Sequence, residues 1–354
     1  GAVRIDGVGT AWSPEPRTLF AELAGTTSRF VTAVAALGSA PITIDGRPPL
    51  RARPFGPLHE ALRQIGVDVS PGERFGNLPA TVTGPPTTGR VEIRGDVSSQ
   101  YVTALMLIGP ELPGGLDLRL TTPLISRPYV EMTAAVMAWF GITDVDVSTD
   151  RIRVGPGAYV PADVAVEPDA SSAGYPLALA ALCGGSITVP GLGEGALQGD
   201  ARFADVLGAM GCSVTRDADQ VTVAGSDVLL GVDIDMADIS DLVPTVAVVA
   251  AFASSPTRIR GVGFIREKES DRLGDLSAEL RRAGVDVDET DDGLEIRPSA
   301  TLLRPARLAT HHDHRLAMAF GVLGSASDGI VVEDPDVVSK SWPAFWTMLD
   351  ELHA

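Results

Sequence analysis

Residues 58–69 read LHEALRQIGVDV and contain the local pattern from which most of the chain is built. Leu58, Leu62 and Ile65 recur at helical spacing, so they lie on one face of a predicted amphipathic helix. Gly66 follows this face, and glycine readily adopts the left-handed conformation that ends a helix. The next residues, VDV, alternate apolar and polar as a half-buried strand does. The stretch therefore predicts a helix, a glycine cap and a strand.

The same order occurs three more times along the chain. The other copies are residues 132–145 (MTAAVMAWFGITDV), 203–214 (FADVLGAMGCSV) and 276–287 (LSAELRRAGVDV). The capping glycines, Gly66, Gly141, Gly211 and Gly284, recur roughly every 70–75 residues, a longer period than solenoid repeats have. Each unit is therefore expected to be a small α+β subdomain with its own sheet. Strands are predicted between the helices at residues 41–45, 91–94, 116–120, 186–189, 221–223 and 257–260.

The length and composition indicate a two-domain globular protein. A chain of 354 residues exceeds the size at which single hydrophobic cores stop growing. Hydrophobic residues make up 45% of the chain, too many for a disordered protein, although the net charge is −18. We expect an α+β (α/β-like) fold with an N-terminal-half domain at residues 1–166 and a C-terminal-half domain at residues 167–354.

The acidic charge also excludes classes of partner. Nucleic acids and anionic membranes select basic surfaces, so neither is an expected partner. The sequence contains neither an apolar run of membrane-spanning length nor a signal-peptide pattern. Cys183 and Cys212 are too few for a disulfide framework or a structural zinc site, and both are expected to be core thiols. A cytoplasmic location is the prediction.

Three short stretches place cations beside carboxylates in this acidic chain. They are residues 268–272 (KESDR), 312–315 (HDHR) and 339–341 (SKS). Such groups suit a closed anion site, in which cations hold a phosphate or carboxylate and a nearby acid moves a proton. Surface ion pairs at helix ends are the alternative for any one of them. A fourth stretch, residues 233–241, holds several aspartates and could be a divalent-metal loop or a capped helix start.

The two ends of the chain look unfinished under the repeat. Residues 1–6 (GAVRID) resemble the strand that follows a capping glycine, without the helix before it. Residues 344–353 (AFWTMLDELH) resemble a helix without its following strand. We therefore expect the first unit to be truncated and some N-terminal sequence to be missing.

Read in order, the motifs resemble those of the EPSP synthases, of the enolpyruvyl transferase family. The resemblance runs from about residue 20 to the C-terminus. It implies two globular domains that close on the substrate like jaws, and each domain would contain three βαβαββ-type units. The resemblance rests on ten stretches: residues 23–30 (LAGTTSRF), 51–58 (RARPFGPL), 96–101 (DVSSQY), 124–129 (LISRPY), 169–172 (DASS), 198–203 (QGDARF), 233–241, 268–272, 312–315 and 339–340.

One motif of that family is missing. A Gly-Ser-Lys-Ser strand near the family's N-terminus holds both substrates, and no such stretch occurs here. The repeat period and the resemblance together imply that roughly 70 residues are absent. A catalytically defective fragment is therefore an alternative to an active enzyme.

The resemblance implies a reaction and a set of substrates. The enolpyruvyl group of phosphoenolpyruvate (PEP) is transferred to the 5-hydroxyl of shikimate 3-phosphate, and phosphate is released, in the shikimate pathway to aromatic amino acids. The family needs no metal and no organic cofactor, and a monomer is expected. Two phosphates and two carboxylates must leave water, so several cations have to converge on them.

The resemblance also assigns roles to individual residues. Asp241 would take the 5-hydroxyl proton, Glu269 and Lys268 would protonate the PEP methylene, and His314 would assist. The PEP ligands would be Gly25, Arg53, Gln100, Arg272, Arg315 and Lys340. The shikimate 3-phosphate ligands would be Ser98, Ser99, Gln100, Ser126, Tyr129, Asp241 and Lys268.

Several of these residues also fit structural roles. Ser98 suits a helix N-cap, Tyr129 a half-buried aromatic and His314 a structural histidine. Phe264 departs from the family, in which many members have a polar residue near the substrate ring. UDP-N-acetylglucosamine enolpyruvyl transferase is the nearest rival, but it typically carries a cysteine where this chain has Pro48.

Overall fold

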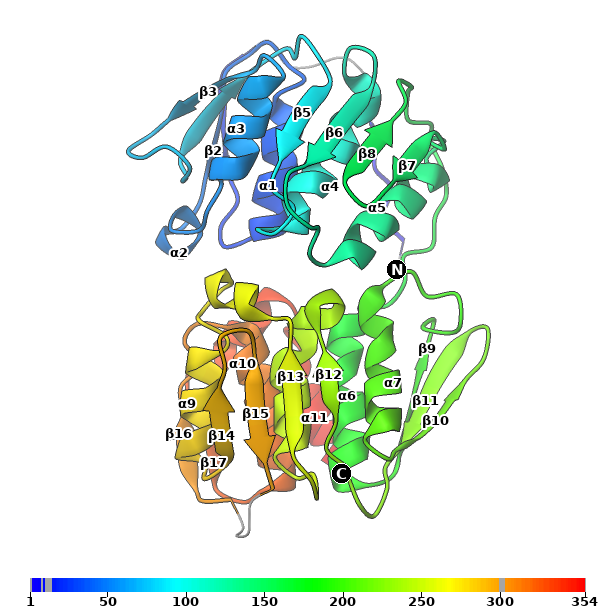
Figure 1. Ribbon diagram of the computed structural model, residues 1–354, viewed down its shortest axis with the longest axis vertical. Helices are drawn as coiled ribbons and strands as arrows, with labels where there is room; N and C mark the ends of the chain where they lie inside the picture. Colours follow the sequence, from blue (N-terminus) through cyan, green and yellow to red (C-terminus); the bar gives the residue numbers. More distant parts are fainter. Residues whose placement is uncertain (1, 8, 10–14, 299–302, 354) are drawn as a thin grey trace. The chain divides into compact units, whose positions relative to one another are not determined.

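The order strand, helix, strand, helix, strand, strand recurs in the computed structural model of the chain, which describes residues 2–7, 9, 15–298 and 303–353. The chain divides into two compact units, Gly1–Val164 and Ala165–Ala354, and both contain copies of this order (Figure 1). The predicted α+β fold of repeated βαβαββ units is confirmed.

The first unit holds two complete copies. The first consists of β1 (Arg17–Phe20), α1 (Gly25–Ala35), β2 (Ile42–Asp45), α3 (Gly56–Gln64), β3 (Asp68–Pro71) and β4 (Ala80–Thr83), with the short helix α2 (Pro48–Arg51) before α3. The second consists of β5 (Arg90–Ile93), α4 (Ser99–Ile108), β6 (Leu116–Leu120), α5 (Arg127–Trp139), β7 (Val145–Val147) and β8 (Arg151–Val154). Each copy forms one sheet, in the orders β1-β2-β4-β3 and β5-β6-β8-β7, whose first two strands are parallel.

The second unit holds one complete copy, flanked by two shorter ones. The complete copy consists of β12 (Asp233–Asp235), α8 (Val243–Ala250), β13 (Thr257–Arg260), α9 (Gly274–Arg282), β14 (Asp286–Glu289) and β15 (Leu294–Arg297). Before it come α6 (Ala170–Cys183), β9 (Ser186–Pro190), α7 (Phe203–Ala209), β10 (Ser213–Arg216) and β11 (Gln220–Ala224). After it come β16 (Ala306–Leu308), α10 (His314–Ala326), β17 (Ile330–Val332) and α11 (Phe345–His353). Their sheets have the orders β12-β13-β15-β14, β10-β11-β9 and β16-β17.

The capping glycines behave as the sequence predicts. Gly66, Gly141, Gly211 and Gly284 have φ angles of 91°, 89°, 104° and 93°, which side chains other than glycine rarely adopt. At Gly66 the space is closed as well, because an added Cβ would lie 2.2 Å from the Thr87 hydroxyl oxygen. All four helix ends therefore depend on glycine.

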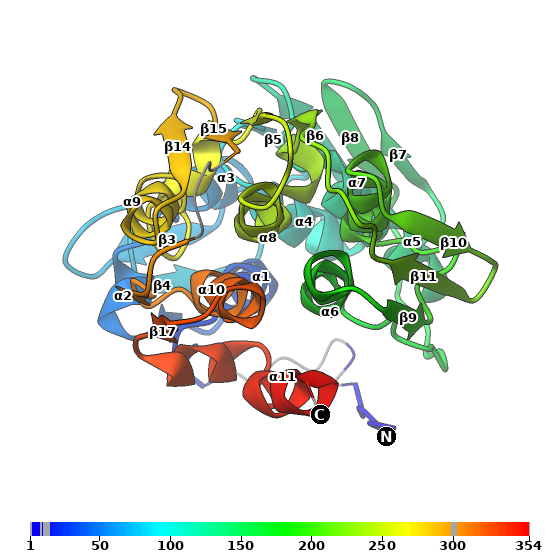
Figure 2. The same cartoon turned by 90° about the horizontal axis from the view of Figure 1, so that it is seen from below.

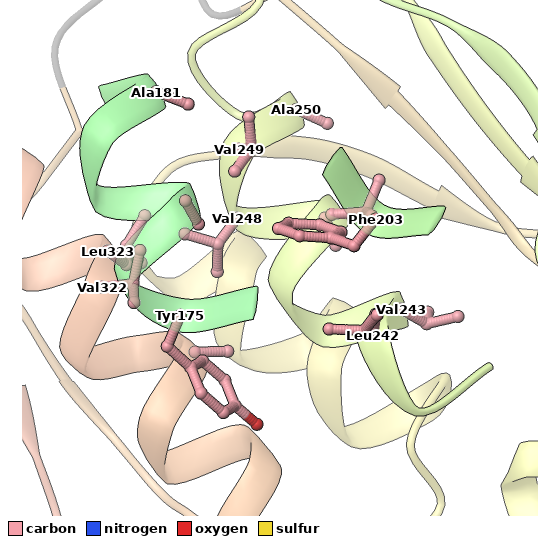
Figure 3. Packing of buried hydrophobic residues seen from close by; sticks show 14 of the residues in the cluster. Tyr175, Ala181, Phe203, Leu242, Val243, Val248, Val249, Ala250, Val322 and Leu323 are labelled. Atoms are coloured by element: carbon pink, nitrogen blue, oxygen red, sulfur yellow. The ribbon is translucent and has the colours of Figure 1, made fainter. Parts of the chain in front are cut away.

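The core of the second unit is built on largely apolar helices. In the second unit α6, α8 and α10 pack against one another, and Figure 2 views them nearly end-on. Every residue of α8 is buried, and Val248 and Val249 belong to the same buried cluster as Phe203 of α7 (Figure 3). A helix without a polar face is stable only inside a protein, so the sheets cover the outside. No helix in the described ranges is both long and apolar enough to cross a membrane.

Two sequence-based expectations are wrong. The predicted strand at residues 1–6 does not form in the part that is described, residues 2–6, where Val3 and Ile5 are exposed and no described strand pairs with them; residue 1 lies outside the description. Cys183 is an exposed residue at the end of α6, whereas Cys212 is buried as expected. The helix predicted at residues 344–353 is confirmed as α11.

A buried histidine in the first unit gives a prediction about stability. His59 of α3 lies between Phe55 and Phe75, and neither ring nitrogen has a hydrogen-bond partner among the described residues. Burial, with the charge of Arg63, lowers its pKa to about 4. The folded protein thus keeps His59 neutral, while the unfolded chain binds a proton below its ordinary pKa of about 6.5. The free energy of unfolding therefore decreases as the pH falls from about 6.5 towards 4.

His59→Leu should remove this loss, because leucine does not titrate. Between pH 7 and pH 5 the wild type should lose about 2 kcal/mol more unfolding free energy than the variant. Urea unfolding at both pH values measures the difference. Equal losses in the two proteins would show that His59 is not held neutral.

Candidate active site

The candidate residues follow the carboxyl ends of parallel strands. The pairs β1/β2, β5/β6, β12/β13 and β16/β17 are all parallel. Each helix that follows such a strand begins at that strand's carboxyl end. The polar segments that connect these strands to their helices, here called joints, therefore lie together at one edge of each sheet. Open α/β sheets bind ligands at this edge. The joints hold residues 23–30, 51–58, 96–101, 124–129, 236–241, 268–272, 312–315 and 339–340. This topology explains why motifs far apart in sequence occur in repeat order.

In the second unit, three cations and three carboxylates form one ion-pair network, here called the anion cluster. Its members are Asp241, Glu269, Arg272, Asp313, Arg315 and Lys340. Arg272 is at its centre: Nη1 donates to Asp241 Oδ1 at 2.9 Å, and Nη2 donates to Glu269 Oε2 at 2.7 Å. Its Nε donates to Asp313 Oδ2 at 2.7 Å. The anion cluster therefore links side chains from four separate joints of the second unit.

The other two cations complete the anion cluster at its edge. Arg315 Nη2 donates to Asp241 Oδ2 at 2.8 Å, and Lys340 Nζ donates to Glu269 Oε1 at 2.7 Å. The side chains of Arg272 and Asp313 are 1% and 0% exposed, whereas that of Arg315 is 16% exposed. Arg272 thus belongs to the scaffold, and Arg315 and Lys340 can reach a ligand.

The charge state of Asp241 follows from these contacts. Burial raises the pKa of Asp241, but the charges of Arg315, Lys268 and Arg272 outweigh it and hold the pKa well below its ordinary value. Asp241 is therefore ionised at neutral pH. Two other aspartates of residues 233–241 differ from it, because Asp233 and Asp238 form exposed pairs with arginines outside the cluster.

Helix starts strengthen the positive field at this edge. Asp241 lies in a 3-10 helix (Ala237–Leu242) that leads directly into α8. Asp313 is the N-cap of α10 and accepts from the Arg315 backbone N–H at 2.9 Å. The first N–H groups of both helices point towards the same edge, and helix N-termini favour anions.

A strained turn sets the position of Asp313. His311 and His312, just before it, have φ angles of 50° and 58°, in the left-handed region that residues with a Cβ rarely adopt. Such strain concentrates where a fold must aim a particular group, here the N-cap carboxylate that holds Arg272.

His314 is buried beside the anion cluster. Burial and the charge of Arg315 lower its pKa to about 4, although Asp313 opposes this. Its Nδ1 lies 3.7 Å from Asp313 Oδ1, beyond hydrogen-bonding distance. His314 is therefore neutral at pH 7, which suits a hydrogen-bonding role better than proton donation.

Lys268 and Phe264 contact each other on the same joint. The Lys268 ammonium lies 5.7 Å from the centre of the Phe264 ring, within the range of a cation–π contact. Phe264, where the family often has a polar residue, thus supports a lysine that the sequence assigns to the site.

In the first unit, Gly25 and Arg53 fit closely together. Gly25 is the first residue of α1, and an added Cβ would lie 2.5 Å from Arg53 Nη1. Only glycine lets the guanidinium lie against the start of α1. The two predicted PEP ligands therefore occupy one place in the structure.

Gln100 is held by a buried arginine. Arg29 Nη1 donates to Gln100 Oε1 at 2.6 Å, and Gln100 Nε2 donates to the Thr26 hydroxyl at 3.0 Å. The Arg29 guanidinium also stacks over Tyr101, whose hydroxyl donates to the Pro54 carbonyl at 2.6 Å. These contacts give Arg29 a structural role, because they orient Gln100.

The predicted shikimate 3-phosphate residues of the first unit lie at two neighbouring helix starts. Ser98 is the N-cap of α4 and accepts from the Gln100 backbone N–H at 3.3 Å, and Ser99 is the first residue of α4. Ser126 precedes α5 with φ 52°, and Tyr129 lies in the first turn of α5. Since α4 and α5 pack together and both follow parallel strands, these residues share one edge.

One residue of the cluster was given no role from the sequence. Asp313 stands inside the HDHR motif, but it both caps α10 and pairs with Arg272. Its position immediately before an apolar helical stretch is an N-cap signal, which could have identified it.

Known proteins are similar to this chain in sequence and in fold. The sequence profile of the family described as "EPSP synthase (3-phosphoshikimate 1-carboxyvinyltransferase)" matches residues 2–349. A 3-phosphoshikimate 1-carboxyvinyltransferase from Methanoculleus marisnigri is 44% identical over 326 residues, covering 92% of this chain and 77% of the relative. Its counterpart from a Nostoc species is 39% identical over 347 residues, covering 98% and 81%.

A solved structure agrees on the fold. An EPSP synthase from Acinetobacter baumannii superposes with a TM-score of 0.78 at 24% identity, covering 95% of this chain and 78% of that one. Together with the profile and the relatives, the motif joints and the anion cluster lead to one assignment. The chain belongs to the EPSP synthase family.

Proposed function

We propose that this protein transfers the enolpyruvyl group of PEP to the 5-hydroxyl of shikimate 3-phosphate and releases inorganic phosphate. The anion cluster carries this proposal, because it combines an ionised carboxylate with cations that can bind an anion. The relatives named 3-phosphoshikimate 1-carboxyvinyltransferase support the same reaction.

Substrate anions are bound by cations that the fold already positions. Arg315 and Lys340 would turn from Asp241 and Glu269 to the phosphate and carboxylate of PEP. Guanidinium groups suit this role because they pair with both anions through two parallel hydrogen bonds. Ser98, Ser99, Gln100, Ser126 and Tyr129 would donate hydrogen bonds to shikimate 3-phosphate.

Binding of PEP would also activate the base. While Arg315 is paired with Asp241, the carboxylate is a weak base. Once Arg315 turns to PEP, the pKa of Asp241 should rise towards its ordinary value, because Asp241 then has one cation fewer beside it. Substrate binding thus prepares Asp241 to accept the hydroxyl proton.

The chemical steps balance with the groups present. The 5-hydroxyl oxygen attacks C2 of PEP and gives its proton to Asp241, while Lys268, or Glu269 once it has bound a proton, gives a proton to C3. The tetrahedral intermediate then returns a proton from C3 to the residue that supplied it, and phosphate leaves C2 with the proton held by Asp241. The net products are the enol ether and inorganic phosphate.

The two-substrate requirement tests this function. Phosphate release by the full-length protein should need PEP and shikimate 3-phosphate together. Activity with UDP-N-acetylglucosamine in place of shikimate 3-phosphate would contradict the proposal. The expected cytoplasmic location and monomeric state stay predictions.

Removing either outer cation should impair the use of PEP. In Arg315→Ala or Lys340→Ala, kcat/KM for PEP should fall by about 30-fold to 4,000-fold, the equivalent of about 2–5 kcal/mol for truncating one partner of a charge pair. The affinity for shikimate 3-phosphate alone should change little. Steady-state kinetics and calorimetry measure the two quantities.

Arg258→Ala is the matched control, because Arg258 forms an exposed pair with Glu295 away from the cluster. Unchanged PEP kinetics in both cluster variants would rule out their role as PEP ligands.

A further inference from the structure

Tyr175 is a buried polar residue of the second unit that the proposed reaction does not use. It lies in the second turn of α6 and is 0% exposed. Its ring packs edge-on against Phe345, with a centroid distance of 5.6 Å. The hydroxyl oxygen is buried without a hydrogen-bond partner among the described residues. Because an unpaired buried hydroxyl is destabilising, phenylalanine would suit a purely structural position better.

The Tyr175 hydroxyl points out of the apolar core. Figure 3 shows it directed away from Val248 and Val249. Burial raises the pKa of Tyr175 to about 12, and the charges of Arg315 and Arg272 oppose this rise. Arg315 is the second residue of α10, and α10 packs against α6, the helix that holds Tyr175. A phenol oxygen can accept a hydrogen bond, and a guanidinium group can only donate one.

The two arginines near Tyr175 differ in their freedom to move. Arg272 is held by three carboxylates and is 1% exposed. Arg315 is paired with Asp241 and is 16% exposed. Arg315 is therefore the guanidinium that can turn towards an incoming anion. The Tyr175 hydroxyl, on the neighbouring helix, accepts no hydrogen bond from any residue that the structure describes.

We propose that the Tyr175 hydroxyl is a positioning group for Arg315. When Arg315 turns from Asp241 to PEP, the phenol oxygen accepts a hydrogen bond from its guanidinium group and fixes the orientation in which it meets the anion. Tyr175 does not touch the substrate. This inference rests on the proposed function in one respect, the binding of PEP by Arg315.

Tyr175→Phe tests the inference, because it removes the hydroxyl and keeps the ring that packs on Phe345. In the full-length protein KM for PEP should rise by about tenfold, the worth of a hydrogen bond to a charged group. KM for shikimate 3-phosphate should stay unchanged, and the thermal midpoint should stay equal or rise. A purely structural tyrosine would leave both KM values unchanged.

Thr245→Val is the matched control. Thr245 of α8 also has a buried hydroxyl without a partner among the described residues, but no role at the site is assigned to it. Its replacement should leave KM for PEP unchanged. An equal rise in this control would overturn the proposal, because the effect would then follow from any lost hydroxyl in the core.

A double-mutant cycle with Arg315→Lys shows whether Tyr175 acts through Arg315. Lysine keeps the charge but lacks the planar fork, so Tyr175→Phe should change KM for PEP by less than twofold in that background. A full tenfold change there would overturn the inference. An inactive wild type would contradict the proposed function, whereas an active wild type with an unchanged KM in Tyr175→Phe contradicts this inference alone.

Discussion

Replacing Arg272 with methionine should destabilise the protein by about 3–5 kcal/mol, because it leaves buried carboxylates without their cation. Asp313 is fully buried and Asp241 and Glu269 lie beside it, so three negative charges would repel one another. Burial would then raise their pKa values, and the variant should regain stability as the pH falls and the carboxylates bind protons. Denaturant unfolding at pH 7.5 and pH 5.5 measures both effects.

Asp313→Asn in the Arg272→Met background separates charge from packing. Asparagine still caps a helix but carries no charge, so the double variant should recover part of the lost stability. Arg260→Ala is the control, because its pair with Asp233 is exposed and should contribute at most about 1 kcal/mol. A loss below 1 kcal/mol in Arg272→Met would show that the cluster does not depend on this guanidinium.

Replacing Asp241 with asparagine should lower kcat by about 10²–10⁴-fold, the usual worth of a positioned general base. The amide keeps the shape of the side chain but cannot accept the hydroxyl proton. KM for PEP should fall or stay unchanged, since Arg315 loses a competing carboxylate. Steady-state kinetics with both substrates separate kcat from KM.

Asp238→Asn is the control for that variant. Asp238 belongs to the same aspartate-rich stretch, yet it pairs with exposed Arg202 rather than with the anion cluster. Its replacement should leave kcat within about twofold of the wild type. A comparable fall in kcat in both variants would mean that Asp241 is not the base.

Much of the fold was predictable because its signals are local. A glycine such as Gly66 must follow a helix for a steric reason that a short stretch contains. The same stretch occurs four times, so one local solution accounts for much of both units. The strand predicted at residues 1–6 does not form in its described part, residues 2–6. A strand forms only beside a partner strand, and the local sequence does not show whether such a partner exists.

The candidate site was predictable as motifs but not as a network. Residues 268–272 and 312–315 each show mixed charges, yet nothing local says that Arg272 holds Asp241, Glu269 and Asp313 together. That arrangement depends on parallel strands that bring separate joints to one edge. A role for Tyr175 could not be predicted from the sequence either, since this residue lies within an apolar helix outside every motif.

The most direct test of the proposed reaction is the mass of the product formed in D₂O. Addition of a solvent-exchanged proton to C3 of PEP makes a methyl group, and loss of one of its hydrogens restores the methylene. The product should therefore have the mass of shikimate 3-phosphate plus PEP minus phosphoric acid, with deuterium in its methylene group. A product of that mass without deuterium would contradict proton transfer to C3, and phosphate release without such a product would contradict enolpyruvyl transfer itself.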